Sequence, residues 1–167
     1  MGWQESRVTL IPPGWYEVSE PSPTARTYGD RPVMIVRTER ESNGQGVGLP
    51  PALVQHWLEE RGFKISETWK NGAQLEKGDI LSELYCRDNE LSEIILTFIL
   101  SRDVPARWDA WQAFVNDICR QFGLSLGDSA QNRKVGPDEL LRLLSETISW
   151  QDFQRNFKWP SVAAVGK

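Results

Sequence analysis

Eight tryptophans in a chain of 167 residues constrain the fold more than any other feature of this sequence. Each indole ring buries roughly 150–250 Å² when it enters a core, so the chain needs one extended apolar interior. A chain of this length fits a single ordinary domain. We therefore expect one domain over residues 1–159 with a tryptophan-rich core, followed by a C-terminal tail over residues 160–167.

Short apolar runs bounded by Gly, Pro, Asn and Asp predict the β-strands. The strands are expected at residues 6–11, 15–18, 32–38, 63–69, 80–86 and 92–100. The last two are expected to form an antiparallel hairpin across residues 87–90. Residues 94–100 are apolar nearly throughout, which predicts a central strand covered on both faces, and residues 32–38 are expected to be buried in the same way.

Apolar residues at helical spacing predict the helices. The first runs from about residue 50 to 61, ends at Gly62, and has an apolar face made of Leu53, Val54, Trp57 and Leu58. The longest begins after the N-cap Asp103 and ends at Gly123. A third begins at Gly136-Pro137, and Ser149 with Asp152 resembles a capping box for a last short helix.

The order of these elements determines the expected fold class. Residues 125–135 are polar and are expected to form a loop. Strands that precede a run of helices are typical of an α+β architecture. The sequence predicts a single α+β domain with a mostly antiparallel sheet of about five or six strands and three or four helices packed chiefly on one side.

Imidazole and thiol groups are scarce, since the chain has one histidine and two cysteines. Many acid/base catalysts and metal sites are built from such groups. His56 precedes Glu60 by four residues, which is the spacing of an ordinary exposed helix pair. Cys86 and Cys119 show no CxxC spacing and are expected to be reduced core thiols. The sequence therefore predicts a protein that is not an enzyme, with no catalytic residue, no metal and no cofactor.

Carboxylates leave a second route to chemistry open. Glu67, Asp79 and Glu83 lie in or beside predicted strands, and two carboxylates can perform acid/base hydrolysis without histidine. Acidic residues on the solvent face of a sheet are far commoner. The glycine run over residues 44–48 lies between a strand and a helix, but its spacing is not GxGxxG, which favours a surface loop over a nucleotide site.

Charge and hydropathy narrow the choice of partner. The net charge is −4 and no basic stripe is present, which argues against a nucleic-acid partner. The first residues are polar and the longest apolar run, residues 94–100, is too short to cross a bilayer, so we expect no signal segment and no membrane partner. Gly2 and Ser6 match the N-myristoylation pattern only loosely, and we expect no lipid there. These features predict a cytoplasmic location.

The tryptophans divide into two groups by position. Trp57, Trp108 and Trp111 lie on helical apolar stripes and are expected in the core. Tryptophans at segment ends or near loops are candidate anchors for a partner, and acidic residues near loops would complement a basic one. Trp3 also lies at such an end. The predicted partner-binding residues are Trp15, Glu39, Glu41, Trp69, Asp88, Glu90 and Trp159.

These observations support three hypotheses about function. The first is a non-enzymatic protein-interaction domain, most specifically a bacterial immunity or antitoxin-like inhibitor that binds a basic protein, possibly a toxin. The second is a small-ligand-binding or hydrolytic protein that uses carboxylates and His56 in a pocket between sheet and helices. The third is an assembly chaperone or scaffold subunit, in which the apolar tail from residue 159 to 167 would dock on a neighbouring chain.

Overall fold

The computed structural model describes residues 4–22, 34–41 and 48–157, which contain nine strands and four α-helices. The strands are β1 (Gln4–Ile11), β2 (Trp15–Pro21), β3 (Met34–Arg40), β4 (Lys64–Trp69), β5 (Gly72–Lys77), β6 (Ile80–Arg87), β7 (Glu90–Leu100), β8 (Ser125–Asp128) and β9 (Arg133–Val135). The helices are α1 (Pro51–Glu60), α2 (Val104–Phe122), α3 (Leu140–Ser145) and α4 (Ile148–Phe157), with a 3₁₀ turn, η1 (Pro137–Glu139), before α3.

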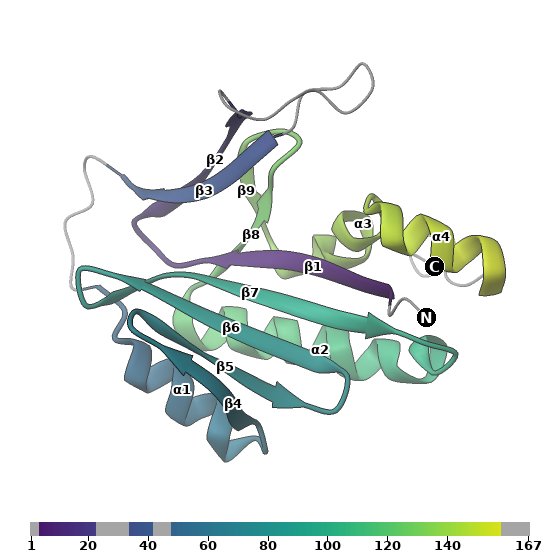
Figure 1. Ribbon diagram of the computed structural model, residues 1–167, viewed down its shortest axis with the longest axis horizontal. Coiled ribbons are helices and arrows are strands. Elements are labelled where there is room, and N and C mark those ends of the chain that lie inside the picture. The colour runs from purple at the N-terminus through teal and green to yellow at the C-terminus, as the bar shows by residue number, and fades with distance from the viewer. Residues whose placement is uncertain (1–3, 23–33, 42–47, 158–167) are drawn as a thin grey trace.

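Seven of the strands form one antiparallel sheet in the order β4-β5-β6-β7-β1-β8-β9 (Figure 1). The sheet is built from hairpins, and β1 is inserted between β7 and β8. The hairpin of β6 and β7 turns at Asp88 and Asn89, whose φ angles of 55° and 64° are typical of a two-residue turn. The predicted hairpin is therefore confirmed, and β7 is the central strand, as expected.

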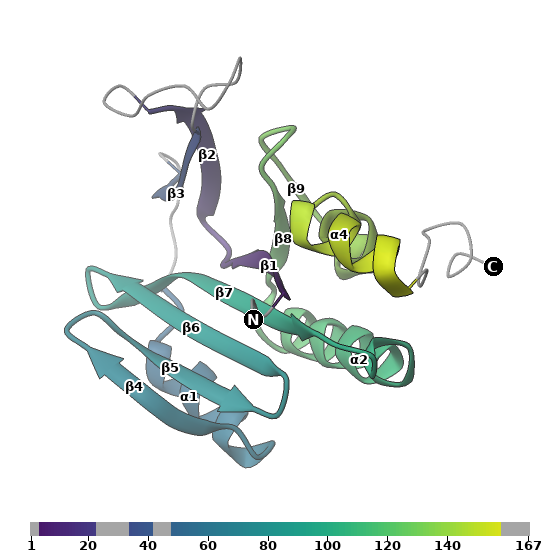
Figure 2. The ribbon, with the colours of Figure 1, turned by 45° about the vertical axis from the view of Figure 1, so that its right-hand side comes forward.

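One face of the sheet carries the core. Alternate residues of β7, Ile94, Leu96 and Phe98, are fully buried, and the Phe98 ring lies 4.8 Å from Trp111 of α2. Figures 1 and 2 show α1 and α2 side by side along this face. Trp108 and Trp150 join α2 to α4, with ring centroids 5.9 Å apart. The α+β class with helices on one side is thus the observed fold.

The other two strands, β2 and β3, form a separate antiparallel pair, which we call the ribbon. The ribbon rises away from the layer of α1 and α2 (Figure 2). Its residue Glu17 contacts Gly127 of β8 and Thr9 of β1. Because Leu126 and Leu10, the neighbours of these two residues, are buried in the core, the ribbon covers the opposite face of the sheet.

Three expectations about strands are wrong. The described residues hold nine strands, because β5, with the sequence Gly-Ala-Gln-Leu-Glu-Lys, and the polar residues 125–135, expected as a loop, also pair as strands. The strand expected at residues 32–38 is not buried throughout: Thr38 is buried, but Met34, Ile35 and Val36 are 47%, 39% and 47% exposed. Among the described strands it pairs only with β2, and no other described strand covers these three apolar residues.

The helices lie where they were expected, with three corrections. Asp103 precedes α2, but its side chain makes no capping hydrogen bond. Leu53 is 56% exposed, while Val54, Trp57 and Leu58 of the same helix are buried. The last helix begins at Ile148, ahead of Ser149, and its cap is Thr147, whose Oγ1 accepts a hydrogen bond from the backbone N–H of Trp150 at 3.2 Å. Within the described residues, no helix is long and apolar enough to cross a membrane.

Replacing Thr147 by Val tests this cap. The Thr147 hydroxyl also bonds Ser6 Oγ at 2.9 Å and donates to the carbonyl of Leu144 at 2.7 Å, so its loss removes a helix cap and a link to β1. We expect the free energy of unfolding to fall by about 1–2 kcal/mol in urea denaturation. The matched control is Ser149→Ala, which we expect to change it by less than about 0.5 kcal/mol. An equal loss in the control would show that Ser149 caps the helix.

Candidate functional site

The base of the ribbon is fixed to the main sheet by Trp15. Its ring is 2% exposed and lies near two guanidinium groups, with Arg40 Cζ 5.1 Å and Arg87 Cζ 5.6 Å from the ring centroid. Arg40 also forms an ion pair with Glu90, which is 8% exposed. Arg87 donates a hydrogen bond to the carbonyl of Thr38. Trp15 and Glu90 therefore hold the ribbon in place, and the expectation that they are exposed is wrong.

The predicted carboxylates Glu39 and Glu41 lie on β3 and directly after it. Lys134 of β9 joins Glu41 to the ribbon base, since its Nζ bonds Glu41 at 2.9 Å and the carbonyl of Trp15 at 3.1 Å. Glu39 accepts hydrogen bonds from Arg37 Nε at 2.9 Å and from the Tyr16 hydroxyl at 3.0 Å. The Arg37 guanidinium lowers the pKa of Glu39 from its usual range. The structure thus brings Trp15, Glu41 and Glu90 together, but as internal contacts.

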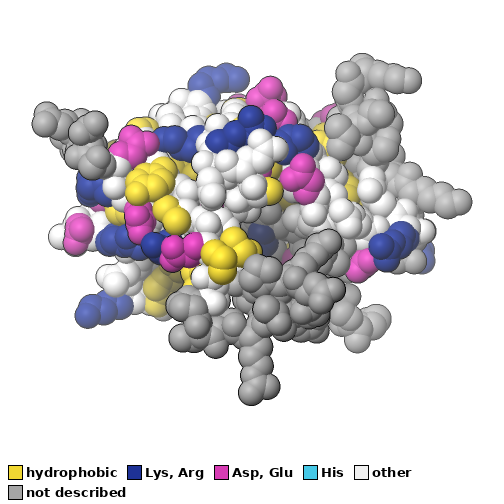
Figure 3. Space-filling model, turned by 90° about the horizontal axis from the view of Figure 1, so that it is seen from above, with side chains coloured by type: hydrophobic (Ala, Val, Ile, Leu, Met, Phe, Trp, Pro, Cys, Tyr) yellow, Lys and Arg dark blue, Asp and Glu magenta, His cyan; other side chains and the backbone are white. Residues whose placement is uncertain are grey.

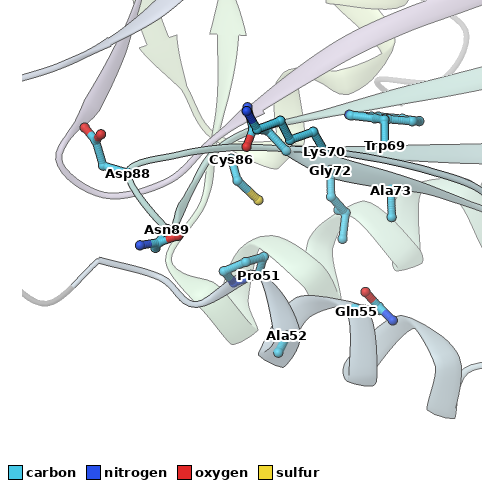
Figure 4. A pocket seen from close by; sticks show the side chains of 12 residues that line it. Pro51, Ala52, Gln55, Trp69, Lys70, Gly72, Ala73, Cys86, Asp88 and Asn89 are labelled. Carbon is cyan, nitrogen blue, oxygen red and sulfur yellow. The ribbon is translucent and has the colours of Figure 1, made fainter.

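Trp69 and Asp88 lie elsewhere, on the rim of a surface pocket of about 370 Å³ between α1 and the turns of the sheet (Figure 4). The Trp69 ring is half-buried and lies 5.5 Å from the Tyr85 ring. Cys86 also lines this pocket, and burial raises the pKa of its thiol, so the thiol is a poor nucleophile. Trp3 and Trp159 lie outside the described residues.

A second hollow of about 450 Å³ lies beneath the ribbon, and we call it the cleft. It opens where β1 and β8 diverge, because these strands pair only at Leu10 with Leu126 and at Ile11 with Ser125. Its walls come from the ribbon, from β1, β7 and β8, and from the helical segment around α3. The residues that line it are Arg7, Val8, Thr9, Glu17, Val36, Ile95, Gly127, Asp128, Ser129, Ala130, Leu143, Glu146 and Thr147.

Glu17 is the unusual residue of the cleft. Its side chain is only 6% exposed, and its Oε1 has no hydrogen-bond partner among the described residues. Burial raises the pKa of Glu17, a hydrogen bond from the Thr9 hydroxyl acts in the opposite direction, and the carboxylates of Glu93 and Asp128 raise it further. A buried carboxylate with an unpaired oxygen and a raised pKa is a candidate functional group.

The cleft accommodates Glu17 because residue 127 is glycine. A Cβ at this position would lie 2.8 Å from Glu17 Oε1, so a side chain here would displace the carboxylate. The other charged groups of the lining have partners: Arg7 pairs with Glu5 at 3.7 Å, and Arg142 pairs with Asp128 at 3.0 Å and with Glu146 at 3.1 Å. Glu17 is therefore the charged group of the lining that lacks an ion-pair partner among the described residues.

The remaining candidates from the sequence have structural roles. His56 Nε2 lies 2.6 Å from Glu60 Oε1 and both side chains are exposed, which confirms the ordinary helix pair. Asp79 accepts hydrogen bonds from Arg107 and from the indole N–H of Trp111, so it links β6 to α2. Gly48, the one member of the glycine run that is described, packs against Glu90.

Glu67 and Glu83 lie on different strands, β4 and β6. Burial raises the pKa of Glu93, and the carboxylate of Glu83 raises it further, so Glu83 and Glu93 are neighbours. Glu67 is exposed on β4, and Glu83 accepts a hydrogen bond from the Tyr85 hydroxyl. Among the described residues, no group of three or more His, Cys, Asp or Glu side chains is arranged to hold a metal ion. Comparisons of the chain with protein-family models, with curated proteins and with solved structures found no match.

Glu17 was missed because the strand was assessed as a whole. The signal was its register: Trp15, Glu17 and Ser19 share one face of a strand, so a large apolar ring and a carboxylate point the same way. If the ring is buried, the carboxylate is buried too. The sequence alone does not say what the strand packs against.

Replacing Glu17 by Gln should stabilise the protein at neutral pH. The folded-state pKa of Glu17 is raised, so its contribution to stability is complete when the carboxyl is protonated and is lost as the pH rises through the folded-state value. Gln removes this loss because it is neutral at every pH. We therefore expect the variant to exceed the wild type in free energy of unfolding by a margin that grows from about pH 4 to about pH 7.

Urea denaturation at several pH values measures this margin. Glu20→Gln is the matched control, because Glu20 lies on the same strand but is exposed and pairs with Arg37. The control should show no such growth. A margin that shrinks as the pH rises would mean that Glu17 is stabilised as a carboxylate.

Proposed function

We propose that this chain is a protein-interaction domain that docks a partner on the outer edge of the ribbon. The observation that carries the proposal is the exposure of three consecutive apolar residues, Met34, Ile35 and Val36, on β3. Consecutive residues of a strand point to opposite faces, so both faces of this end of the ribbon are apolar and open. Exposed apolar patches of this kind are typical of interaction sites.

The backbone of β3 supports the same proposal. In the described part of the chain β3 pairs only with β2, which leaves its other edge without a neighbouring strand. The carbonyl of Thr38 on that edge accepts a hydrogen bond from Arg87. Peptide groups alternate in direction along a strand, so those of Met34 and Val36 lie on the same edge. A partner strand could add there by β-augmentation, with pockets for alternate side chains.

The distribution of charge on the ribbon indicates what kind of partner could bind there. Its outward face carries both signs, since Arg37 forms ion pairs with Glu20 and Glu39. Viewed from above, hydrophobic side chains reach the surface among Lys, Arg, Asp and Glu (Figure 3). These observations support a partner that makes apolar and backbone contacts with the ribbon more strongly than a basic partner that binds an acidic surface. The toxin-inhibitor version and the cytoplasmic location stay predictions.

Photo-crosslinking in the native host tests the proposal. A photoreactive amino acid replaces Ile35 in one variant and Glu67 of β4, an equally surface-exposed strand residue, in the control. We expect a discrete adduct from position 35 and none from position 67. β4 is also an edge strand, but it has one exposed large apolar residue, Ile65, whereas β3 has three in a row. Sedimentation of the purified chain then decides whether the partner is a second copy.

Affinity for the crosslinked partner provides the decisive measurement. Val36→Pro removes a backbone N–H and blocks strand addition, so we expect the dissociation constant to rise about tenfold or more in calorimetry. Glu67→Pro is not a useful control because it breaks β4, whereas Glu67→Ala should leave the affinity unchanged. The proposal fails if positions 35 and 67 give the same adducts, or if Val36→Pro binds as the wild type does.

A further inference from the structure

We infer that the cleft beneath the ribbon is a binding site for a monovalent organic cation, an ammonium or guanidinium group on a short alkyl chain, which donates hydrogen bonds to Glu17. This site shares Val36 with the free edge of β3, through the side chain and not through the peptide group, and it does not depend on the proposed protein interaction. The inference rests on Glu17 itself, on the pairing of the charges around it, and on the shape and lining of the cleft.

The first argument is that Glu17 lacks a hydrogen bond at one oxygen and lacks an ion-pair partner among the described residues. Glu17 lines the cleft and is only 6% exposed. Its Oε1 accepts no hydrogen bond from the described part of the chain. A buried acceptor without a partner is costly, and a buried carboxylate without a counter-charge more so. A ligand that brings both N–H donors and a positive charge removes both costs at once.

The second argument is the sign of the neighbouring charges. Glu93 and Asp128 act on Glu17 as carboxylates. The described lining holds one cation, Arg7, which pairs with Glu5 and is 63% exposed. Arg142 lies outside the lining and is shared by Asp128, Glu139 and Glu146. An anionic ligand would lie beside Asp128 and Glu146, which also line the cleft, and would find Arg7 already paired. A cation is favoured by these carboxylates and by the ionised form of Glu17, so we expect the cleft to select positive charge.

The third argument is the size and the apolar part of the lining. A hollow of about 450 Å³ exceeds the needs of a bare metal ion. Val36 forms part of the roof, Ile95 lies on β7 and Leu143 on α3, so apolar side chains from three elements flank the polar centre. An alkyl chain of a few carbons would contact these side chains while its charged end reaches Glu17.

Binding should also expel a proton. Burial and the carboxylates of Glu93 and Asp128 favour protonated Glu17 in the empty cleft, whereas a bound cation favours the carboxylate. The other charged groups that face Glu17 are Arg7 on β1 and Glu146 at the end of α3, and both are ion-paired. Affinity is therefore expected to rise from about pH 4 to about pH 7 as the proton becomes easier to displace.

Titration calorimetry of the full chain tests the inference with n-butylguanidinium and n-butylammonium as probes. n-Butanol has the same alkyl chain without charge, butyrate reverses the charge, and Mg²⁺ is a divalent cation without an alkyl chain. We expect binding of at least one of the two organic cations and none of the three controls. A capped peptide with one Arg between glycines distinguishes the source: tighter binding of the peptide identifies a protein side chain, and equal or weaker binding a free cation.

Two variants locate the site. Glu17→Gln keeps the shape but removes the charge, so the affinity should fall about tenfold or more and the proton release should vanish. Val36→Arg would place a guanidinium of the chain itself beside Glu17, and it should block the free cation while leaving Glu17 in place. Glu20→Gln, on the same strand outside the cleft, should bind like the wild type.

The inference is overturned by three results. One is the absence of cation binding to the wild type, and another is tight binding by Glu17→Gln with its circular dichroism unchanged. The third is binding of butyrate as well as of the cations, which would mean that the cleft selects alkyl chains and not charge. None of these results bears on the ribbon edge, so the two proposals can fail separately.

Discussion

The position of the ribbon depends first on the Trp15 ring, which lies beside the Arg40 and Arg87 guanidinium groups. Arg40 comes from the ribbon and Arg87 from β6, so the ring couples the two sheets. Glu90 pairs with Arg40 and balances its charge in a mostly buried position. Together with the bonds of Lys134 to Glu41 and to the Trp15 carbonyl, this contact sets the angle of the ribbon. The shape of the cleft and the orientation of the outer edge follow from that angle.

Much of the fold follows from local patterns that can be identified in the sequence. The apolar run of β7, the two-residue turn at Asp88 and Asn89, and the stripe that ends at Gly123 are each specified by residues close together in the chain. Such signals depend on periodicity and backbone conformation, which do not require knowledge of the partner element. They were sufficient for the α+β class and for the side on which the helices lie.

The errors share a physical cause, which is that burial depends on what lies opposite a strand. Met34, Ile35 and Val36 form an apolar run like that of β7, but among the described strands β3 pairs only with β2 and lies outside the main sheet. The reverse holds for Asp128, a polar residue that is 1% exposed because Arg133 and Arg142 neutralise it. Trp15 was expected at the surface for the same reason, since its neighbours lie far away in the sequence. Periodicity specifies faces, and only the tertiary fold specifies which face is covered.

The ribbon connects the two proposed sites, because Val36 belongs to both. Its side chain lines the cleft, while its peptide group lies on the free edge of β3. A cation held between Glu17 above and Thr9 and Ile95 below would favour the docked position of the ribbon over any displaced one. A strand added to β3 would favour the same docked position if it also contacts the main sheet. Two ligands that favour one conformation must strengthen each other's binding by an equal factor. The strength of any coupling between the cleft and the edge therefore depends on how rigidly Trp15 holds the base of the ribbon.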